Sequence, residues 1–246
     1  MARIENRKKS GAEAPTKGDL TRQRILAATA KVLSHKGFAS TRLSDIAEEA
    51  NMQAPAIYYY YDSREELIVE VIRYGSADTC KIVAAVLDAL PSGYDPLQRI
   101  MVAVEVHLRH MLEISDFATA AARNLGQLPD ELKTAPQEEQ RRYGFLWLAL
   151  VEEAMAAELC APDLDPALSV LLLLGALNYT AEWYDPERGS VDRIVKSAQS
   201  LVHNALAGAK ADSEKTYPQI GEPSAWLAAR SSTDHAESGA DGTPSV

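Results

Sequence analysis

The feature that most constrains the fold is the stretch of residues 41–67, which carries two short helical patterns joined by a turn. Leu43 and Ile46 recur at helical spacing, so the first helix has one apolar face. A helix of about two turns is unstable alone, so this face needs neighbours to pack against. Asn51 suits the left-handed residue that ends such a helix, and Pro55 suits the first turn of the next. The pattern predicts a helix-turn-helix.

The second helix, expected over residues 54–60, carries most of a run of four tyrosines. One helix face cannot bury four neighbouring rings, so we expect Ile57 and either Tyr58 or Tyr61 to face inward. Outward tyrosines beside small alanines can enter a major groove and contact phosphates or thymine methyl groups. A helical hairpin with ordinary aromatic packing is the alternative. The expected DNA-binding residues are Thr41, Arg42, Gln53, Ala54, Pro55, Ala56, Tyr58, Tyr59, Tyr60 and Arg64.

Polar residues at the ends of these helices predict how the helices are capped. Thr41 precedes the first helix and is expected to accept a hydrogen bond from the N–H groups that open it. Ser63, with Glu66 three residues later, predicts a capping box at the start of a third helix. Arg64 follows this cap and is expected near the DNA phosphates, where it would contribute charge rather than base selectivity.

The stretch Leu20–Leu67, about a fifth of the chain, resembles the DNA-binding domain of TetR-family transcriptional repressors. The resemblance implies an all-α repressor that binds duplex DNA and holds a small ligand in a second helical domain. Five segments of this stretch match the family pattern in the same order, namely Thr21–Ala30, Lys36-Gly37-Phe38, Thr41–Ala47, Ile57–Tyr61 and Ser63–Leu67.

Four positions depart from that family pattern. Asn51 replaces a turn glycine, and Gln53 replaces a serine or threonine cap, which leaves the second helix less well capped. Tyr61 stands in place of phenylalanine and Arg64 in place of lysine. None of these departures conflicts with the helix-turn-helix geometry.

Charge is distributed unevenly along the chain. The net charge is −10, yet residues 1–64 hold 11 Lys and Arg against 7 Asp and Glu, while residues 65–246 hold 14 against 28. Positive charge is therefore concentrated around the expected DNA-binding domain. Residues 1–17 are expected to be a basic flexible arm that follows the DNA backbone or enters a minor groove, with a solvated tail as the alternative.

The remainder of the chain is expected to be helical. The predicted helices span 19–36, 42–50, 54–60, 63–89, 96–115, 117–125, 130–160, 164–184 and 191–208. Asp95 and Pro96 predict the start of the helix over 96–115, as its cap and its first-turn proline. The expected organisation is a flexible arm at 1–17, a DNA-binding domain at 18–64, a helical ligand-binding and dimerisation domain at 65–208, and a largely disordered tail at 209–246. No apolar run is long enough to span a membrane and no secretory signal is apparent, so we expect a cytoplasmic protein.

The last two predicted helices have the composition of an interface. Residues 164–184 are apolar on nearly all sides, and residues 191–208 carry one apolar stripe. Packed against their symmetry mates they would form a four-helix bundle, although a monomer core that uses both faces internally is the alternative. TetR-like proteins pair in this way, which implies a homodimer on a near-palindromic operator with half-sites roughly 34–36 Å apart.

Polar and aromatic residues inside the apolar helices are candidates for the ligand site. Ordinary packing accounts for each of them as well. Leu177–Pro186 also loosely resembles TetR-like regulators of lipid and acyl-CoA degradation, which implies a fatty or steroid acyl-CoA as inducer. The candidate ligand-binding residues are His107, Phe117, Arg123, Tyr143, Trp147, Asn178 and Trp183.

Motifs for catalysis and metal binding are weak. His107 and His110 lie three residues apart, but two imidazoles alone do not complete a metal site. Glycines are scattered singly, and no Gly-x-Ser-x-Gly motif is present. We therefore expect no enzyme, no catalytic residue, no metal site and no cofactor. The competing class is a helical interaction protein without a DNA role, which would not need the tyrosine run or the local positive charge.

Overall fold

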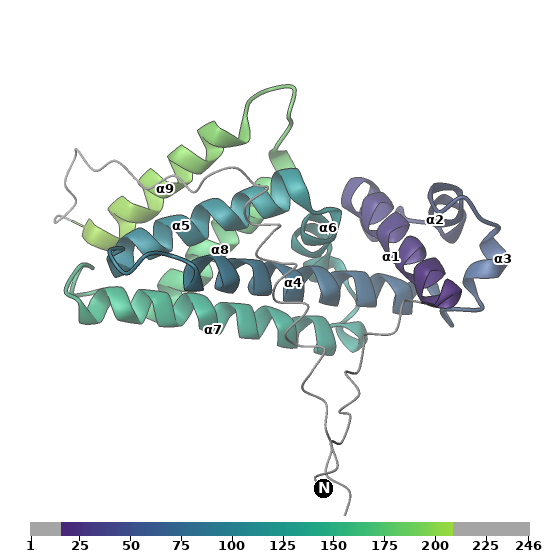
Figure 1. Cartoon of the computed structure of the whole chain (residues 1–246), viewed down its shortest axis with the longest axis horizontal. Helices are drawn as coiled ribbons and strands as arrows, with labels where there is room; N and C mark the ends of the chain where they lie inside the picture. Colours follow the sequence, from purple (N-terminus) through teal and green to yellow (C-terminus); the bar gives the residue numbers. More distant parts are fainter. Residues whose placement is uncertain (1–15, 209–246) are drawn as a thin grey trace, which may run out of the picture.

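The computed structural model describes residues 16–208, and within them the chain forms nine α-helices and no strand. Figure 1 shows a small group of helices at one end of a larger helical body. The α-helices are α1 (Lys17–Lys36), α2 (Leu43–Glu49), α3 (Ala54–Ile57), α4 (Arg64–Asp88), α5 (Pro96–Arg109), α6 (Asp116–Asn124), α7 (Thr134–Ala156), α8 (Pro166–Trp183) and α9 (Val191–Ala207). A π-helical turn, His110–Ile114, joins α5 to α6, and two 3-10 turns, Leu125–Gln127 and Asp130–Leu132, precede α7.

The small group consists of α1, α2, α3 and the start of α4, and it has its own core. Ile25 of α1, Ile46 of α2, Ile57 at the end of α3 and Leu67 of α4 are all fully buried against one another. Each of these short helices is stabilised by this shared core rather than by its own length. The side chain of Thr16 caps α1 through a reciprocal pair of hydrogen bonds with Asp19.

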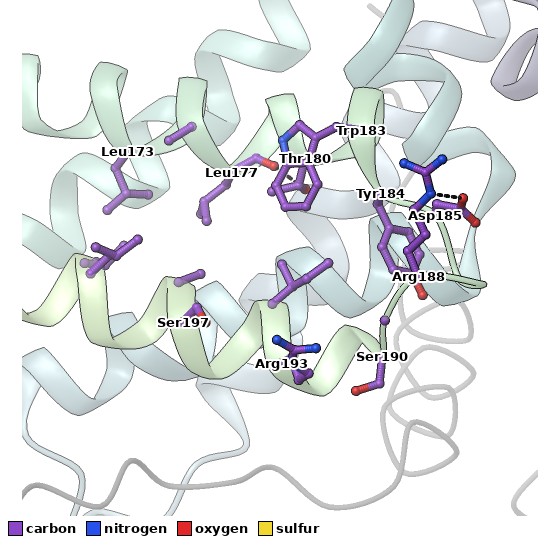
Figure 2. A pocket seen from close by; sticks show the side chains of 16 residues that line it. Leu173, Leu177, Thr180, Trp183, Tyr184, Asp185, Arg188, Ser190, Arg193 and Ser197 are labelled. Atoms are coloured by element: carbon purple, nitrogen blue, oxygen red, sulfur yellow. Dashed lines mark hydrogen bonds and ion pairs between the residues drawn. The ribbon is translucent and has the colours of Figure 1, made fainter.

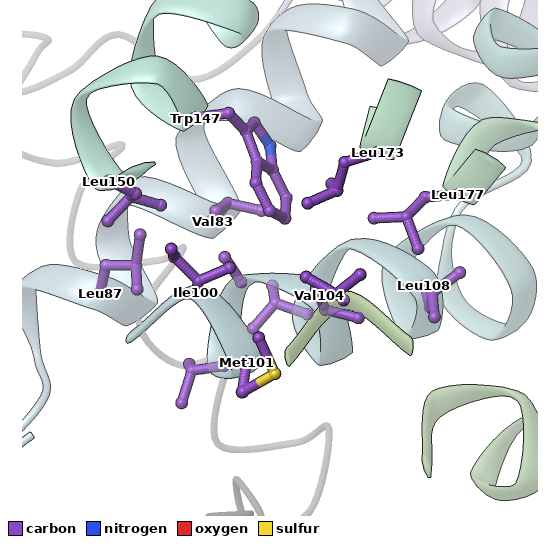
Figure 3. Packing of buried hydrophobic residues seen from close by; sticks show 14 of the residues in the cluster. Val83, Leu87, Ile100, Met101, Val104, Leu108, Trp147, Leu150, Leu173 and Leu177 are labelled. Carbon is purple, nitrogen blue, oxygen red and sulfur yellow. The ribbon is translucent and has the colours of Figure 1, made fainter. Parts of the chain in front are cut away.

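The larger body surrounds α5, which is buried along most of its length by α4, α7, α8 and α9. Figure 3 shows Ile100 and Val104 of α5 on the side that faces Trp147 of α7 and Leu173 of α8, while Met101 of the same cluster points away from these two residues. Asp95 caps α5 and Pro96 opens it, as the sequence predicts. A helix that carries apolar side chains on every face needs this complete cover.

A third cluster joins the two parts of the molecule through α4 and α6. Leu33 of α1, Ile72 of α4 and Ala120 of α6 are fully buried in it. At its edge Gly75 of α4 lies so close to α6 that an added Cβ would sit 2.1 Å from the carbonyl oxygen of Phe117. Because a backbone atom blocks that space, the two helices approach this closely only with glycine at position 75.

The predicted helices match the observed ones in number and order, and their bounds differ by three residues or more at four places. The helix expected over 54–60 ends at Ile57, the helix expected over 96–115 becomes a π turn at His110, and the helix expected over 130–160 spans Thr134–Ala156. Lys17, assigned to the flexible arm, is the first residue of α1. Thr16, also assigned to the arm, caps this helix, while residues 1–15 and the expected tail at 209–246 lie outside the described residues. No helix among the described residues has the length and apolarity to cross a bilayer.

Candidate functional site: a nucleic-acid interface and a buried cavity

The turn between α2 and α3 has the geometry that the sequence predicts. Asn51 has a φ of 51°, in the left-handed region, and the N–H of Met52 donates to the carbonyl of Ala47 at 2.9 Å. Gln53 precedes α3 without a side-chain capping bond, and Pro55 lies in its first turn. These local features place α3 at the outer end of the small domain (Figure 1).

The tyrosine run divides into buried and exposed rings. Tyr61 is 2 % exposed and packs in the core of the small domain, so it is the inward tyrosine, and Tyr58 is not. Tyr60 is partly buried against the same core. Tyr58 and Tyr59 are 59 % and 88 % exposed. We call the outward group of Arg42, Gln53, Pro55, Tyr58 and Tyr59 the tyrosine surface; the half-buried Ala54 and Ala56 lie among these residues.

The structure corrects the role of Thr41. The residue is 1 % exposed, and its hydroxyl donates to the carbonyl of Gly37 at 2.8 Å, so the side chain neither caps α2 nor reaches the surface. Arg42 occupies the N-cap position, where its backbone N–H donates to the Asp45 carboxylate at 3.1 Å. The Arg42 residue itself is exposed.

Arg64 requires a similar correction, because its guanidinium is occupied inside the domain. Its Nη1 donates to the carbonyls of Phe38 and Thr41 at 3.2 and 2.7 Å, and the group lies 4.9 Å from the centre of the Phe38 ring. Arg64 therefore attaches the loop before α2 to the start of α4 instead of extending toward phosphates. Ser63 caps α4 as predicted, whereas the Glu66 carboxylate accepts from the N–H of Asp62 rather than closing the capping box.

A pocket of about 330 Å³, here called the cavity, lies between α4, α5, α6, α7 and α8. It brings together three of the predicted ligand residues, His107, Tyr143 and Asn178. His107 and Tyr143 are buried, whereas Gln137 and Gln140 on the same lining are exposed, so the cavity opens to the surface. Small apolar residues of α6 form part of its wall, among them Ala118 and Ala121, and polar side chains make up more than half of the lining. Polar groups that converge beside an apolar wall are a usual feature of small-molecule sites.

His107 and Tyr143 form a hydrogen-bonded pair at this cavity. Nδ1 of His107 lies 2.9 Å from the Tyr143 hydroxyl, and the two rings are stacked, while Trp147 packs edge-on against both. Burial lowers the pKa of His107 to about 4, helped by the neighbouring His110, with a smaller opposing effect of the Asn178 amide. Burial also raises the pKa of Tyr143. Both groups are therefore neutral at physiological pH.

The other predicted ligand residues do not line this cavity. Phe117 packs against Tyr74 with ring centres 4.9 Å apart, and Arg123 donates to the carbonyl of Ser34 at 2.5 Å. Trp147 is fully buried behind Tyr143. Trp183 lies in a different hollow, between α8 and α9.

Several lining residues were not predicted, namely Ser76, Thr79, Lys133, Gln137 and Gln140. The last two carried a usable signal, because Gln137, Gln140 and Tyr143 follow one another at intervals of three residues and so share a face of α7. Ser76 and Thr79 share a face of α4 for the same reason. No such spacing singles out Lys133, which pairs with Asp130 at 2.8 Å.

The hollow between α8 and α9 is larger, about 520 Å³, and open to solvent on a strongly apolar face. Figure 2 shows Leu173, Leu177 and Trp183 of α8 facing it, with Arg193 and Ser197 on α9 opposite. Beside it lie four exposed leucines, Leu168, Leu171, Leu172 and Leu201, which are 58–76 % exposed. We call these four residues the leucine surface. A monomer that used both faces of α8 internally would have covered them.

A helix-turn-helix with outward tyrosines, attached to a helical body with its own cavity, is the architecture of a DNA-binding regulator. Comparison with known proteins agrees. Residues 25–71 match the family of bacterial regulatory proteins called the tetR family, and residues 93–206 match the tetracyclin repressor-like C-terminal domain. The chain belongs to the TetR family of transcriptional regulators.

Individual relatives are distant but span most of the chain. The transcriptional repressor KstR2 of Mycolicibacterium smegmatis is 23 % identical over 176 residues, 71 % of this chain and 84 % of the relative. The regulator EthR of the same organism is 26 % identical over 200 residues, 78 % and 88 % of the two chains. The crystal structure of AibR in complex with isovaleryl coenzyme A and operator DNA has the same fold, with a TM-score of 0.66 at 16 % identity over 76 % of this chain and 98 % of that one.

Proposed function

We propose that this TetR-type repressor binds a near-palindromic operator as a homodimer and leaves it when a small ligand occupies the cavity. The observation that carries the proposal is the exposure of Tyr58 and Tyr59 at the outer end of the small domain, beside small alanines that allow close approach. A monomer gains nothing from leaving two aromatic rings in solvent. Rings that carry hydroxyl groups suit a partner that offers both phosphates and base edges.

On the DNA side, the proposed contacts are those of the tyrosine surface, with Ala54 and Ala56 as the close-approach positions. Arg42 supplies the positive charge of this group. Thr41 and Arg64 act through the loop and helix that they hold together, and Tyr60 contributes only its exposed edge.

For dimerisation, we propose that the leucine surface and the neighbouring hollow receive α8 and α9 of a second copy. Burying one leucine side chain stabilises an interface by about 1.5–3 kcal/mol, and a two-fold dimer repeats each contact. Because α8 and α9 belong to the larger body, such a dimer leaves both tyrosine surfaces free for two half-sites.

For release, we propose that α6 carries the response from the cavity to the DNA-binding domain. Ala118 and Ala121 of α6 line the cavity. The same helix is attached to the end of α1 through Arg123 on the Ser34 carbonyl and through the Asn124 amide on the Leu33 carbonyl, at 2.5 and 3.3 Å. A ligand that displaces α6 therefore displaces α1, and with it the whole small core.

For the ligand, we propose a fatty or steroid acyl-CoA. The support is the chain's own resemblance at Leu177–Pro186 and two similar proteins: KstR2 of Mycobacterium tuberculosis, described as a ketosteroid regulator, and AibR, crystallised with isovaleryl coenzyme A. The apolar part of the cavity lining, on α6 and the turns beside it, suits the acyl part of such a molecule, and the polar side chains of Lys133, Gln137 and Gln140 suit its polar part.

The test is a mobility-shift titration of the full chain on DNA from upstream of its own gene, at several salt concentrations, with isovaleryl coenzyme A and longer acyl thioesters added. We expect a saturable complex with two protomers per site, steep loss of affinity as salt rises, and release by at least one thioester. Binding that does not exceed that to random duplex would contradict the DNA-binding proposal. Specific binding that no thioester weakens would contradict the ligand proposal.

A further inference from the structure

The inner end of the cavity contains a polar group without a partner. Nε2 of His107 is buried and has no hydrogen-bond partner, although the ring belongs to the cavity wall. The Asn178 amide across from it is near enough to affect the imidazole without completing a hydrogen bond. A buried nitrogen that is left unbonded costs free energy, so a ligand that bonds to it gains affinity.

The neighbours of His107 decide whether Nε2 donates or accepts. Of the two groups in the pair, the phenol O–H is the more acidic donor and the imidazole nitrogen the more basic acceptor. The Tyr143 hydroxyl therefore donates to Nδ1 of His107, 2.9 Å away. Nδ1 is then the acceptor of a neutral imidazole, and Nε2 carries the proton.

We propose that the cavity recognises a compact, largely apolar molecule through a carbonyl oxygen, which accepts a hydrogen bond from Nε2–H of His107. This inference rests on the proposed function, because it names the chemistry that the same cavity selects. A neutral donor beside the apolar side chains of Met111, Ala118 and Ala121 favours an uncharged acceptor, and the carbonyl of a thioester or of a ketone meets that description.

The size of the cavity supports this chemistry. A volume of about 330 Å³ corresponds to about 11 water molecules in the liquid and is near the lower end for ligand sites. A whole coenzyme A thioester exceeds it, so only the acyl chain and the thioester carbonyl enter. The nucleotide then lies outside, beyond the polar side chains of Lys133, Gln137 and Gln140.

The test compares probes that differ only in the carbonyl oxygen. Hexanoyl coenzyme A is compared with S-hexyl coenzyme A, the thioether that lacks the oxygen, and 2-nonanone with 2-methyl-1-nonene, in which a methylene group replaces it. Dissociation constants are measured by calorimetry on the full chain without DNA. We expect the carbonyl member of at least one pair to bind at least tenfold more tightly. The pair that shows the preference identifies the source, thioester or ketone.

Two variants separate recognition from folding. His107→Leu removes the donor and should abolish the carbonyl preference, whereas His107→Gln keeps an amide donor and should retain part of it. Circular dichroism and operator binding without ligand should match the wild type in both. Equal affinity within both pairs, failure of all four probes to bind, or a preference that survives in His107→Leu would each overturn the inference.

An independent measurement addresses the proton position. Nitrogen-15 spectra of the histidine rings should show His107 protonated at Nε2 in the free protein, with that signal shifting on binding of the carbonyl probe. Protonation at Nδ1 would overturn the inference. Operator release is measured separately: a carbonyl preference in binding without any release of DNA would contradict the proposed function and leave the recognition chemistry standing.

Discussion

The tyrosine surface around α3 and the leucine surface on α8 and α9 both leave large side chains in solvent, but they do so with different chemistry. Tyr59 is 88 % exposed and Leu172 is 76 % exposed. The first surface combines ring faces with hydroxyl, amide and guanidinium groups, whereas the second offers aliphatic carbon only. Exposure alone therefore does not identify a partner; the polar groups within the exposed area distinguish a nucleic-acid surface from a protein interface.

The largest expected effect comes from placing a charge on the leucine surface. Leu172→Glu puts two carboxylates into the proposed two-fold interface, where each would be buried without a cation. We expect the dimer to dissociate at micromolar concentration. Operator affinity should then fall roughly a thousandfold, because the two DNA-binding domains no longer bind together. Sedimentation velocity and mobility shift measure these effects.

The matched control is Phe145→Glu, because Phe145 on α7 is 60 % exposed outside both surfaces. It should remain a dimer with normal operator affinity. A dimer that persists in Leu172→Glu would show that the leucine surface has been assigned to the wrong partner.

The second largest effect concerns the tyrosine surface. Tyr59→Ala removes contacts that are worth about 1–3 kcal/mol in each DNA-binding domain of the dimer, so operator affinity should fall roughly thirtyfold or more while the dimer persists. Tyr59→Phe separates the hydroxyl from the ring. Phe145→Ala serves as the control for loss of an exposed aromatic ring. Normal operator binding by Tyr59→Ala would show that the tyrosine surface does not contact the operator.

An acid titration tests the cavity, which belongs to neither surface. His107 has a pKa of about 4 in the folded protein, against roughly 6.5 in the unfolded chain, so as pH falls the unfolded chain takes up the proton first. The contribution of His107 to the free energy of unfolding should therefore decrease between about pH 6.5 and 4, by at most roughly 3 kcal/mol, and change no further below that range. His107→Gln should lack this contribution, and urea denaturation of both proteins measures the difference. Identical pH profiles would mean that His107 is not buried as a neutral ring.

The smallest expected effect tests whether Arg64 lies outside the tyrosine surface. Arg64→Lys keeps the charge but cannot reproduce the hydrogen bonds to the Phe38 and Thr41 carbonyls together with the stacking on Phe38. We expect a loss of about 1 kcal/mol in unfolding free energy, measured by thermal denaturation, with an unchanged salt dependence of operator binding. Because lysine keeps the charge, the phosphate alternative is tested with Arg64→Gln, which removes it: an unchanged salt dependence is expected there too, and a reduced one would place the guanidinium at a phosphate.

Local chemistry explains what could be predicted from the sequence. Asn51, Pro55 and the Asp95-Pro96 pair were placed correctly because a left-handed turn residue, a missing N–H and a capping carboxylate act on the backbone next to them. The choice between Tyr58 and Tyr61 could not be made, because α3 ends at Ile57 and helical spacing no longer applies beyond it.

Tertiary contacts explain what could not be predicted. Thr41 and Arg64 have partners in other segments, and no pattern in their own stretch reveals that these groups are already occupied. The cavity shows the same limit: His107, Tyr143 and Asn178 meet, while Phe117, Arg123 and Trp183 face elsewhere, since the rotation of each helix depends on what packs against it. The DNA contacts stay predictions until a complex is measured.

The close approach of Gly75 to Phe117 has a consequence for how this molecule tolerates mutation. The backbone of α6 rests directly on the backbone of α4, with no side chain between them to adjust. Residues on either side of that point can be exchanged as long as their volumes are matched. At position 75, by contrast, even one methyl group would force the two helices apart and move the DNA-binding domain relative to the rest of the chain. The chain can therefore acquire a new ligand preference by altering the walls of the cavity, whereas a change at this single position would affect DNA binding whatever the ligand.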